Sequence, residues 1–190
     1  MIKNLLAFIG FLSIIALAAT AFYISSIIKS FDPEAPRMYT EFISNLVRDK
    51  NPASAMVWKV PVDEGISAED VKESMKSLAT GNNILFVGES PFYKQAEAVT
   101  GKPYRHVAFM SFCDVRVGML MADYDNAYTA LMPCTISLVE DQQGKLWLFS
   151  LNMDFLIYGG KTLPPELKQA AIKVKNNLQA VIQGAAKGEF

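Results

Sequence analysis

The chain has 190 residues, 51% of them hydrophobic, and its 18 basic residues nearly balance 19 acidic ones. Of the first 30 residues, 21 are hydrophobic, whereas the rest has the composition of an ordinary globular domain. This pattern excludes a polytopic membrane protein, a disordered chain and a collagen-like chain. No cluster of four or more Lys or Arg residues occurs, so the basic footprint of a nucleic-acid-binding protein is missing and no nucleic-acid partner is expected.

An almost continuous apolar stretch runs from Leu5 to Ile28. A helix over this stretch would be about 36 Å long, enough to cross the ~30 Å hydrocarbon core of a bilayer with some tilt. The sequence therefore predicts that residues 1–30 form a transmembrane anchor. A cleaved signal peptide is the alternative, because small residues suited to cleavage occur at 16–18 and 19–21. The apolar run continues beyond both sites, which favours an uncleaved anchor.

The flanking charges do not by themselves set the orientation, because Lys3 and Lys29 lie at opposite ends of the apolar stretch. An anchor near the N-terminus of a bacterial-looking chain most simply leaves residues 31–190 outside the cytoplasm. We therefore expect a single-pass protein of the cytoplasmic (inner) membrane. Its C-terminal domain would lie in the periplasm or outside the cell.

Residues 31–52 are expected to form a Pro-containing linker and a short amphipathic helix over about 36–48. A strand over 55–62 follows, and Ser67 with Asp70 three residues later predicts a capped helix that ends at Gly81. The remaining expected elements are a strand over 84–87, a polar helix over 92–99, an aromatic-rich strand over 104–113, a short helix over 115–122, a β-hairpin formed by 134–139 and 145–151, and a final helix from about Pro164 to Gly184.

This order of elements predicts a single compact domain over residues 53–190, of α+β or α/β class. Helices would pack against a mixed sheet, and one transmembrane helix would precede the domain.

Two short sequences approach catalytic motifs but lack a required residue. The turn at 88–91 would need glycine at the position of Phe92 to be a nucleophile elbow. The sequence at 160–162 would need glycine at the position of Phe155 to end a P-loop. A Cys–His pair would have to use His106, the only histidine, which strand alternation places on the opposite face from Cys113. No catalytic residue is predicted, and a protein without catalytic activity is favoured.

Cysteine, methionine and histidine residues, whose side chains can bind soft metal ions, lie close together in the middle of the chain. Thiolate, thioether and imidazole groups suit copper. Methionine also fills cores, and no two of these residues have the spacing of a known metal site, so core packing is the favoured interpretation. No cofactor is predicted, and copper or another soft metal is the alternative. The candidate ligands are Cys113, His106, Met110, Met119 and Met121.

The two cysteines, Cys113 and Cys134, each lie at the end of an expected strand. If those strands are neighbours, the two sulfurs could form a disulfide in an oxidising compartment. Two buried thiols, or a redox-active or ligand-bearing Cys113, are the other interpretations. The sequence leaves all three open.

Several blocks between Ile66 and about Gly160 carry a family resemblance. The most specific is Met132-Pro133-Cys134 leading into 135–141 and followed by Gly144-Lys145-Leu146-Trp147. In these blocks the chain resembles the bacterial and archaeal domain-of-unknown-function family 302. The resemblance implies a small compact α/β domain, sometimes carried behind a membrane anchor, and no established activity or catalytic residues. The chain departs from many relatives at Asp114-Val115, where their proline is missing.

Together these observations predict a membrane-anchored extracytoplasmic accessory or interaction domain without catalytic activity of its own. Its expected partners are the membrane and other subunits of a membrane protein complex. The alternative is a small-ligand, soft-metal (copper) or redox binding domain that uses Cys113. A third hypothesis is an enzyme with Cys113 as its nucleophile.

Overall fold

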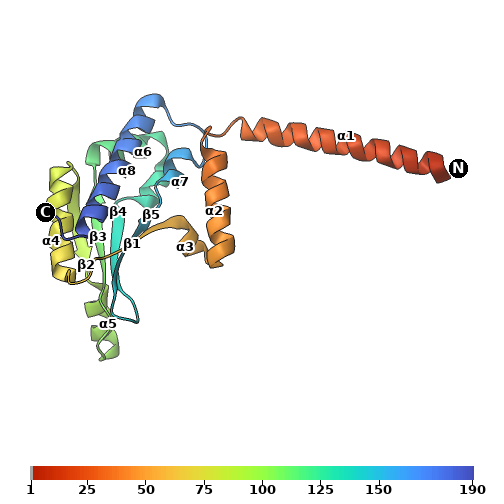
Figure 1. Cartoon of the computed structure of the whole chain (residues 1–190). Coiled ribbons are helices and arrows are strands. Elements are labelled where there is room, and N and C mark those ends of the chain that lie inside the picture. The colour runs from red at the N-terminus through yellow and green to blue at the C-terminus, as the bar shows by residue number, and fades with distance from the viewer. Residues whose placement is uncertain (1) are drawn as a thin grey trace.

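The computed structural model describes residues 2–190, which form a long N-terminal helix and one α+β domain (Figure 1). The domain is built on a five-stranded sheet with the strand order β1-β5-β4-β3-β2. The strands are β1 (Val57–Pro61), β2 (Leu85–Ser90), β3 (Val107–Cys113), β4 (Cys134–Glu140) and β5 (Leu146–Leu151). The helices are α1 (Ile2–Ile28), α2 (Ala35–Asp49), α3 (Pro52–Met56), α4 (Ala68–Gly81), α5 (Phe92–Thr100), α6 (Val115–Tyr124), the 3-10 helix η1 (Asn126–Leu131), α7 (Asp154–Tyr158) and α8 (Pro165–Ala185).

The sheet is antiparallel at every pairing, which confirms the α+β class but corrects the expected mixed sheet. Parallel neighbours need a crossover that returns the chain to the same end of the sheet. Here α5 lies beyond one end of the sheet and α6 at the other, so each connection reverses the strand direction (Figure 1). The predicted hairpin is present as β4 and β5.

Helices α4 and α8 pack side by side and cover one face of the sheet (Figure 1). Strand alternation turns Met110 and Phe112 of β3 into this face, where both are fully buried. One stripe of the predicted final helix, α8, is buried as well, with Leu167, Ala171, Val174, Leu178 and Ile182 among its members. The predicted capping box of Ser67 and Asp70 starts α4. Gly184 lies within α8 instead of ending it, at a point where Leu78 of α4 packs closely against the helix.

Three short elements, α3, η1 and α7, were not predicted. Each has only five or six residues, too few to show a helical period in the sequence. The short helix predicted over 115–122 is present as α6.

Helix α1 projects away from the domain (Figure 1). Its stretch from Phe8 to Ile28 is long and apolar enough to cross a membrane, and none of it is buried. Only three residues separate Ile28 from Asp32, whose side chain is buried in the domain. Four residue steps span at most ~14 Å, so the end of α1 stays close to the domain surface.

Candidate functional site

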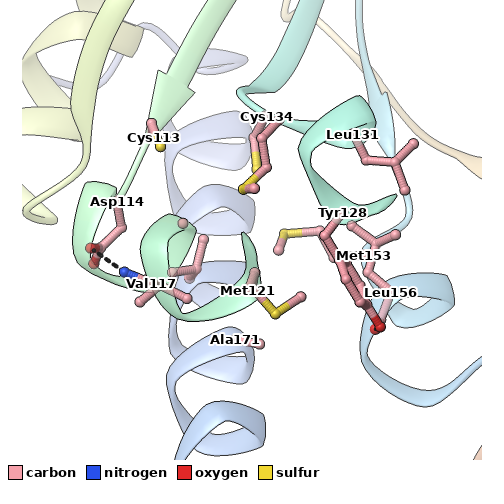
Figure 2. Close-up of a pocket in the computed structure, with 13 residues that line it drawn as sticks. Cys113, Asp114, Val117, Met121, Tyr128, Leu131, Cys134, Met153, Leu156 and Ala171 are labelled. Carbon is pink, nitrogen blue, oxygen red and sulfur yellow. Dashed lines mark hydrogen bonds between the residues drawn. The ribbon is translucent and has the colours of Figure 1, made fainter. Parts of the chain in front are cut away.

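A small cavity lies where the end of β3 and the start of β4 meet α6, η1, α7 and α8 (Figure 2). Its volume is about 40 Å³. Thirteen residues line it, most of them apolar, and five carry sulfur: Cys113, Met121, Met132, Cys134 and Met153. We call this cavity the sulfur pocket.

The two cysteines reach the sulfur pocket from neighbouring strands. Cys134, the first residue of β4, pairs with Phe112 on β3, so both side chains lie on the face that the helices cover. Cys113 follows Phe112 at the end of β3, where the chain turns into α6. Both cysteines are free thiols in the structure, and a disulfide between them stays one of the alternatives that the sequence leaves open.

Asp114 fixes the start of α6 at the edge of the pocket. Its carboxylate accepts hydrogen bonds from the backbone N–H groups of Arg116 (3.1 Å) and Val117 (3.3 Å), and the bond to Val117 is drawn in Figure 2. A side chain that caps two free N–H groups in this way stabilises the first turn of a helix. One helical turn further on, Gly118 and Met121 face the cavity.

Gly118 leaves space between two of the sulfur atoms. A Cβ at this position would lie 3.5 Å from both the Cys113 Sγ and the Met132 Sδ. The two sulfur atoms therefore lie within twice that distance, about 7 Å, of each other. Cys113 comes from β3 and Met132 from the segment after η1, so only the tertiary fold brings them together.

The surroundings keep both thiols protonated at neutral pH. Burial raises the pKa of Cys113, and the negative charge of Asp114 raises it further. Burial raises the pKa of Cys134 to about 11, with a smaller contribution from Cys113. A nucleophilic cysteine needs a lowered pKa and a cationic or basic neighbour, and no basic residue lines this pocket. The environment therefore opposes the hypothesis that Cys113 is a catalytic nucleophile.

The structure brings only Cys113 and Met121 of the five predicted metal ligands to one place. His106 precedes β3 and lies seven residues from Cys113, which is about 23 Å along an extended strand. Met110 is fully buried in the main core, and Met119 is 62% exposed on the outer side of α6. The predicted set is therefore not a single site, because strand alternation and helix periodicity point its members in different directions.

Three sulfur residues of the pocket were missed as ligands: Met132, Cys134 and Met153. They lie up to 40 positions from Cys113 in the sequence, and their spacing matches no metal motif. Within residues 2–190, no three His, Cys, Asp or Glu side chains converge as metal ligands, so any metal in this pocket would depend on methionine thioethers.

His106 occupies a separate environment near β2 and α5. Its ring stacks on Tyr93 with 4.6 Å between centroids, and its Nε2 is buried with no hydrogen-bond partner among the described residues. Burial lowers the pKa of His106, and the nearby charge of Lys72 lowers it further, against the opposing charges of Glu69, Glu140 and Glu89. A neutral histidine packed on an aromatic ring fits a structural role.

Comparison with known proteins agrees with the fold. Residues 58–185 match the family model described as "Domain of unknown function DUF302". An uncharacterized protein of Aquifex aeolicus (strain VF5) is 26% identical over 136 residues, which cover 71% of this chain and 87% of that protein. The crystal structure of an uncharacterized conserved DUF302 protein from Bacillus stearothermophilus superimposes with a TM-score of 0.55 at 11% identity, over 67% of this chain and 96% of that one. The matched family region runs from β1 to α8 and leaves out α1, α2 and α3.

Proposed function

We propose, since this chain belongs to the family of domains of unknown function DUF302, that it is a non-catalytic accessory domain held at the membrane surface by α1. In this proposal the domain lies on the outer side of the cytoplasmic membrane and binds another subunit of a membrane protein complex.

The exposure of α1 carries the proposal. Every side chain that the structure describes in this helix is exposed, although most are apolar. Leaving a Leu, Ile or Phe side chain in water costs about 1.5–3 kcal/mol relative to burying it. Twelve such side chains from Leu6 to Ile28 are exposed, besides Tyr23. The hydrocarbon core of a bilayer removes this cost.

The junction after α1 supports a fixed position of the domain at the membrane. The Asp32 N–H donates to the Gly160 carbonyl (2.8 Å), and the Asp32 carboxylate accepts hydrogen bonds from Lys168 (2.5 Å) and from the Glu34 N–H (3.0 Å). The bonds with Gly160 and Lys168 join the segment after the anchor to the loop before α8 and to α8 itself. A domain tied in this way stays near the membrane instead of moving on a long tether.

Helix α2 supports an interaction close to the membrane. Met38 is buried and Phe42 packs edge-on against Phe155 of α7, with 5.5 Å between ring centroids. On its outer side, Ile43 and Val47 lie one turn apart and are exposed. An apolar pair at this position suits contact with a membrane protein that lies next to the anchor.

Anchoring is tested with the full chain in bacterial membranes. We expect the protein to stay in the membrane fraction after alkaline carbonate washing, and a C-terminal alkaline phosphatase fusion to be active because the domain lies outside the cytoplasm. An inactive phosphatase fusion, together with an active fusion of the same chain to a reporter that works only in the cytoplasm, would contradict the orientation. Release of the intact chain by carbonate would contradict the anchor.

The partner role is tested by crosslinking in membranes followed by native mass measurement of the detergent-solubilised protein. We expect a complex with a second membrane protein that is weakened in the variant Ile43→Asp/Val47→Asp. Glu41→Gln, an exposed change on the same helix, is the matched control and leaves the complex intact. A wild-type chain that migrates alone in both measurements would overturn the proposed role.

A further inference from the structure

We propose that the sulfur pocket binds a single Cu(I) ion through Cys113 and Met132, with Cys134, Met121 and Met153 completing its sulfur lining. This inference does not depend on the membrane anchor or on a partner protein, because all five residues belong to the α+β domain.

The size of the pocket restricts its occupant. A cavity of about 40 Å³ has room for one metal ion or a few water-sized groups, since one water needs roughly 10–15 Å³. Organic ligands and cofactors need pockets of roughly 300–1,000 Å³. The volume therefore selects an ion over a haem, a flavin or a nucleotide.

The chemistry of the lining selects the kind of ion. Thiolate and thioether ligands prefer soft cations, and three neutral thioethers are poor ligands for magnesium or calcium. Zinc sites use thiolate, imidazole and carboxylate ligands, but the one carboxylate of the lining, Asp114, caps the start of α6, and no three side chains of these types converge as metal ligands among the described residues. Cu(I) is the soft first-row ion that binds both thiolate and thioether sulfur.

Charge balance favours a monovalent ion in this environment. Binding replaces the proton of one thiol, so that Cu(I) and the Cys113 thiolate form a neutral pair and one proton is released. The thioethers then complete the coordination without adding charge. A neutral centre fits a cavity lined mainly by apolar side chains, where an unpaired charge would be costly.

The geometry around Gly118 leaves room for such a centre. The Cys113 and Met132 sulfurs flank the position where a side chain at 118 would begin, each 3.5 Å from it. Sulfur–metal bonds are about 2.3 Å long in thiolate sites, so the two sulfurs must draw together to share one ion. The Met132 side chain has three rotatable bonds and can make this movement.

The test uses the full chain in detergent, reduced and free of oxygen, with Cu(I) supplied from the chelator bicinchoninate. We expect one Cu(I) per chain, retained against the chelator, and an X-ray absorption spectrum with sulfur as the only first-shell ligand. Met132→Leu keeps the size and apolar character of the side chain but removes the sulfur. We expect Met132→Leu and Cys113→Ser each to weaken binding at least tenfold.

Met119→Leu and His106→Asn are the matched controls, because Met119 is exposed and His106 lies at the other end of β3. We expect both to bind Cu(I) like the wild type. Circular dichroism establishes that each variant is folded, and Met132→Leu decides the question if Cys113→Ser does not fold. Failure of the wild type to compete with the chelator, unchanged binding in Met132→Leu, or a first shell of nitrogen and oxygen would each overturn the proposal.

Discussion

Asp32 and Lys168 form an ion pair across 136 positions of sequence, with 2.5 Å between the Asp32 Oδ2 and the Lys168 Nζ. The Asp32 side chain is completely buried and that of Lys168 is 23% exposed. Burial by itself raises the pKa of Asp32, but the hydrogen bond from Lys168, the Glu34 N–H and the charge of Lys168 outweigh it and lower the pKa. This pair joins the segment after α1 to the first turns of α8.

We expect Lys168→Met to destabilise the domain by about 3 kcal/mol, because it leaves a buried carboxylate without its cation. Urea unfolding followed by tryptophan fluorescence measures this, since Trp58 and Trp147 both lie in the domain. Arg37→Met is the control: it removes the exposed, solvent-screened ion pair with Glu34 and should lower the stability far less than Lys168→Met does. Equal losses in the two variants would contradict a special role for the buried pair.

The Asp32–Lys168 pair also predicts a response to acid. An aspartate whose pKa is lowered on folding adds stability above its unfolded value of about 3.9, and this stability is lost as the pH falls through the folded value. The contribution of Asp32 should therefore be constant from pH 7 to pH 5 and disappear only below about pH 4. The difference in unfolding free energy between the wild type and Asp32→Asn, measured from pH 3 to pH 7, checks this dependence.

His106 predicts a second pH dependence, in a higher range. Because burial lowers its pKa on folding, the unfolded chain binds more protons near pH 6 than the folded one. His106 does not change the free energy of unfolding at pH values above its pKa in the unfolded chain, about 6.5. As the pH drops below that value, the free energy of unfolding decreases. We expect the wild type to lose more stability than His106→Gln between pH 8 and pH 5, in urea unfolding at each pH. Parallel curves would rule out the histidine as the source.

Gly118 offers a test of the free space inside the sulfur pocket. A Cβ there makes ordinary contacts of 3.5 Å inside α6, so Gly118→Ala should stabilise the metal-free domain by about 0.5–1 kcal/mol through helix propensity. The same change at Gly101, which ends α5 with φ +67°, should destabilise by about 1 kcal/mol. Thermal unfolding measures both. A destabilised Gly118→Ala would show that the pocket has no room for the methyl group.

The thiols predict slow and strongly pH-dependent alkylation. With a pKa of about 11, Cys134 should react with iodoacetamide at a rate that rises about tenfold per pH unit up to pH 10. Mass spectrometry of the reduced, folded chain measures this rate at each pH. A rate that levels off near pH 8.5, the value of a free cysteine, would contradict the buried environment. The unreduced chain in the same experiment tests the alternative of a disulfide between Cys113 and Cys134.

Local patterns in the sequence were enough to locate most secondary structure. The capping box of Ser67 and Asp70 and the hairpin of β4 and β5 depend on residues close together in the chain, and both are confirmed. Helix α8 shows its buried stripe because 21 residues contain several helical periods. The five-residue helices α3 and α7 contain barely more than one period, so no pattern could reveal them.

The candidate site was only partly accessible from the sequence. Cys113 and Met121 were proposed as ligands because they are near each other in the chain. Met132 and Met153 could not be identified, since nothing in their spacing links them to Cys113. His106 and Met110 had the right chemistry, but strand geometry places them elsewhere.

By itself the sequence determined the apolar helix at the N-terminus, the α+β composition and the family resemblance, because each depends on composition or on neighbouring residues. Only the tertiary structure decided that the sheet is antiparallel throughout and that Asp32 meets Lys168. It also decided which sulfur side chains converge. Two cysteines and three methionines spread over 41 positions become one pocket only when β3, β4, α6 and α7 pack together, and no local pattern encodes that packing.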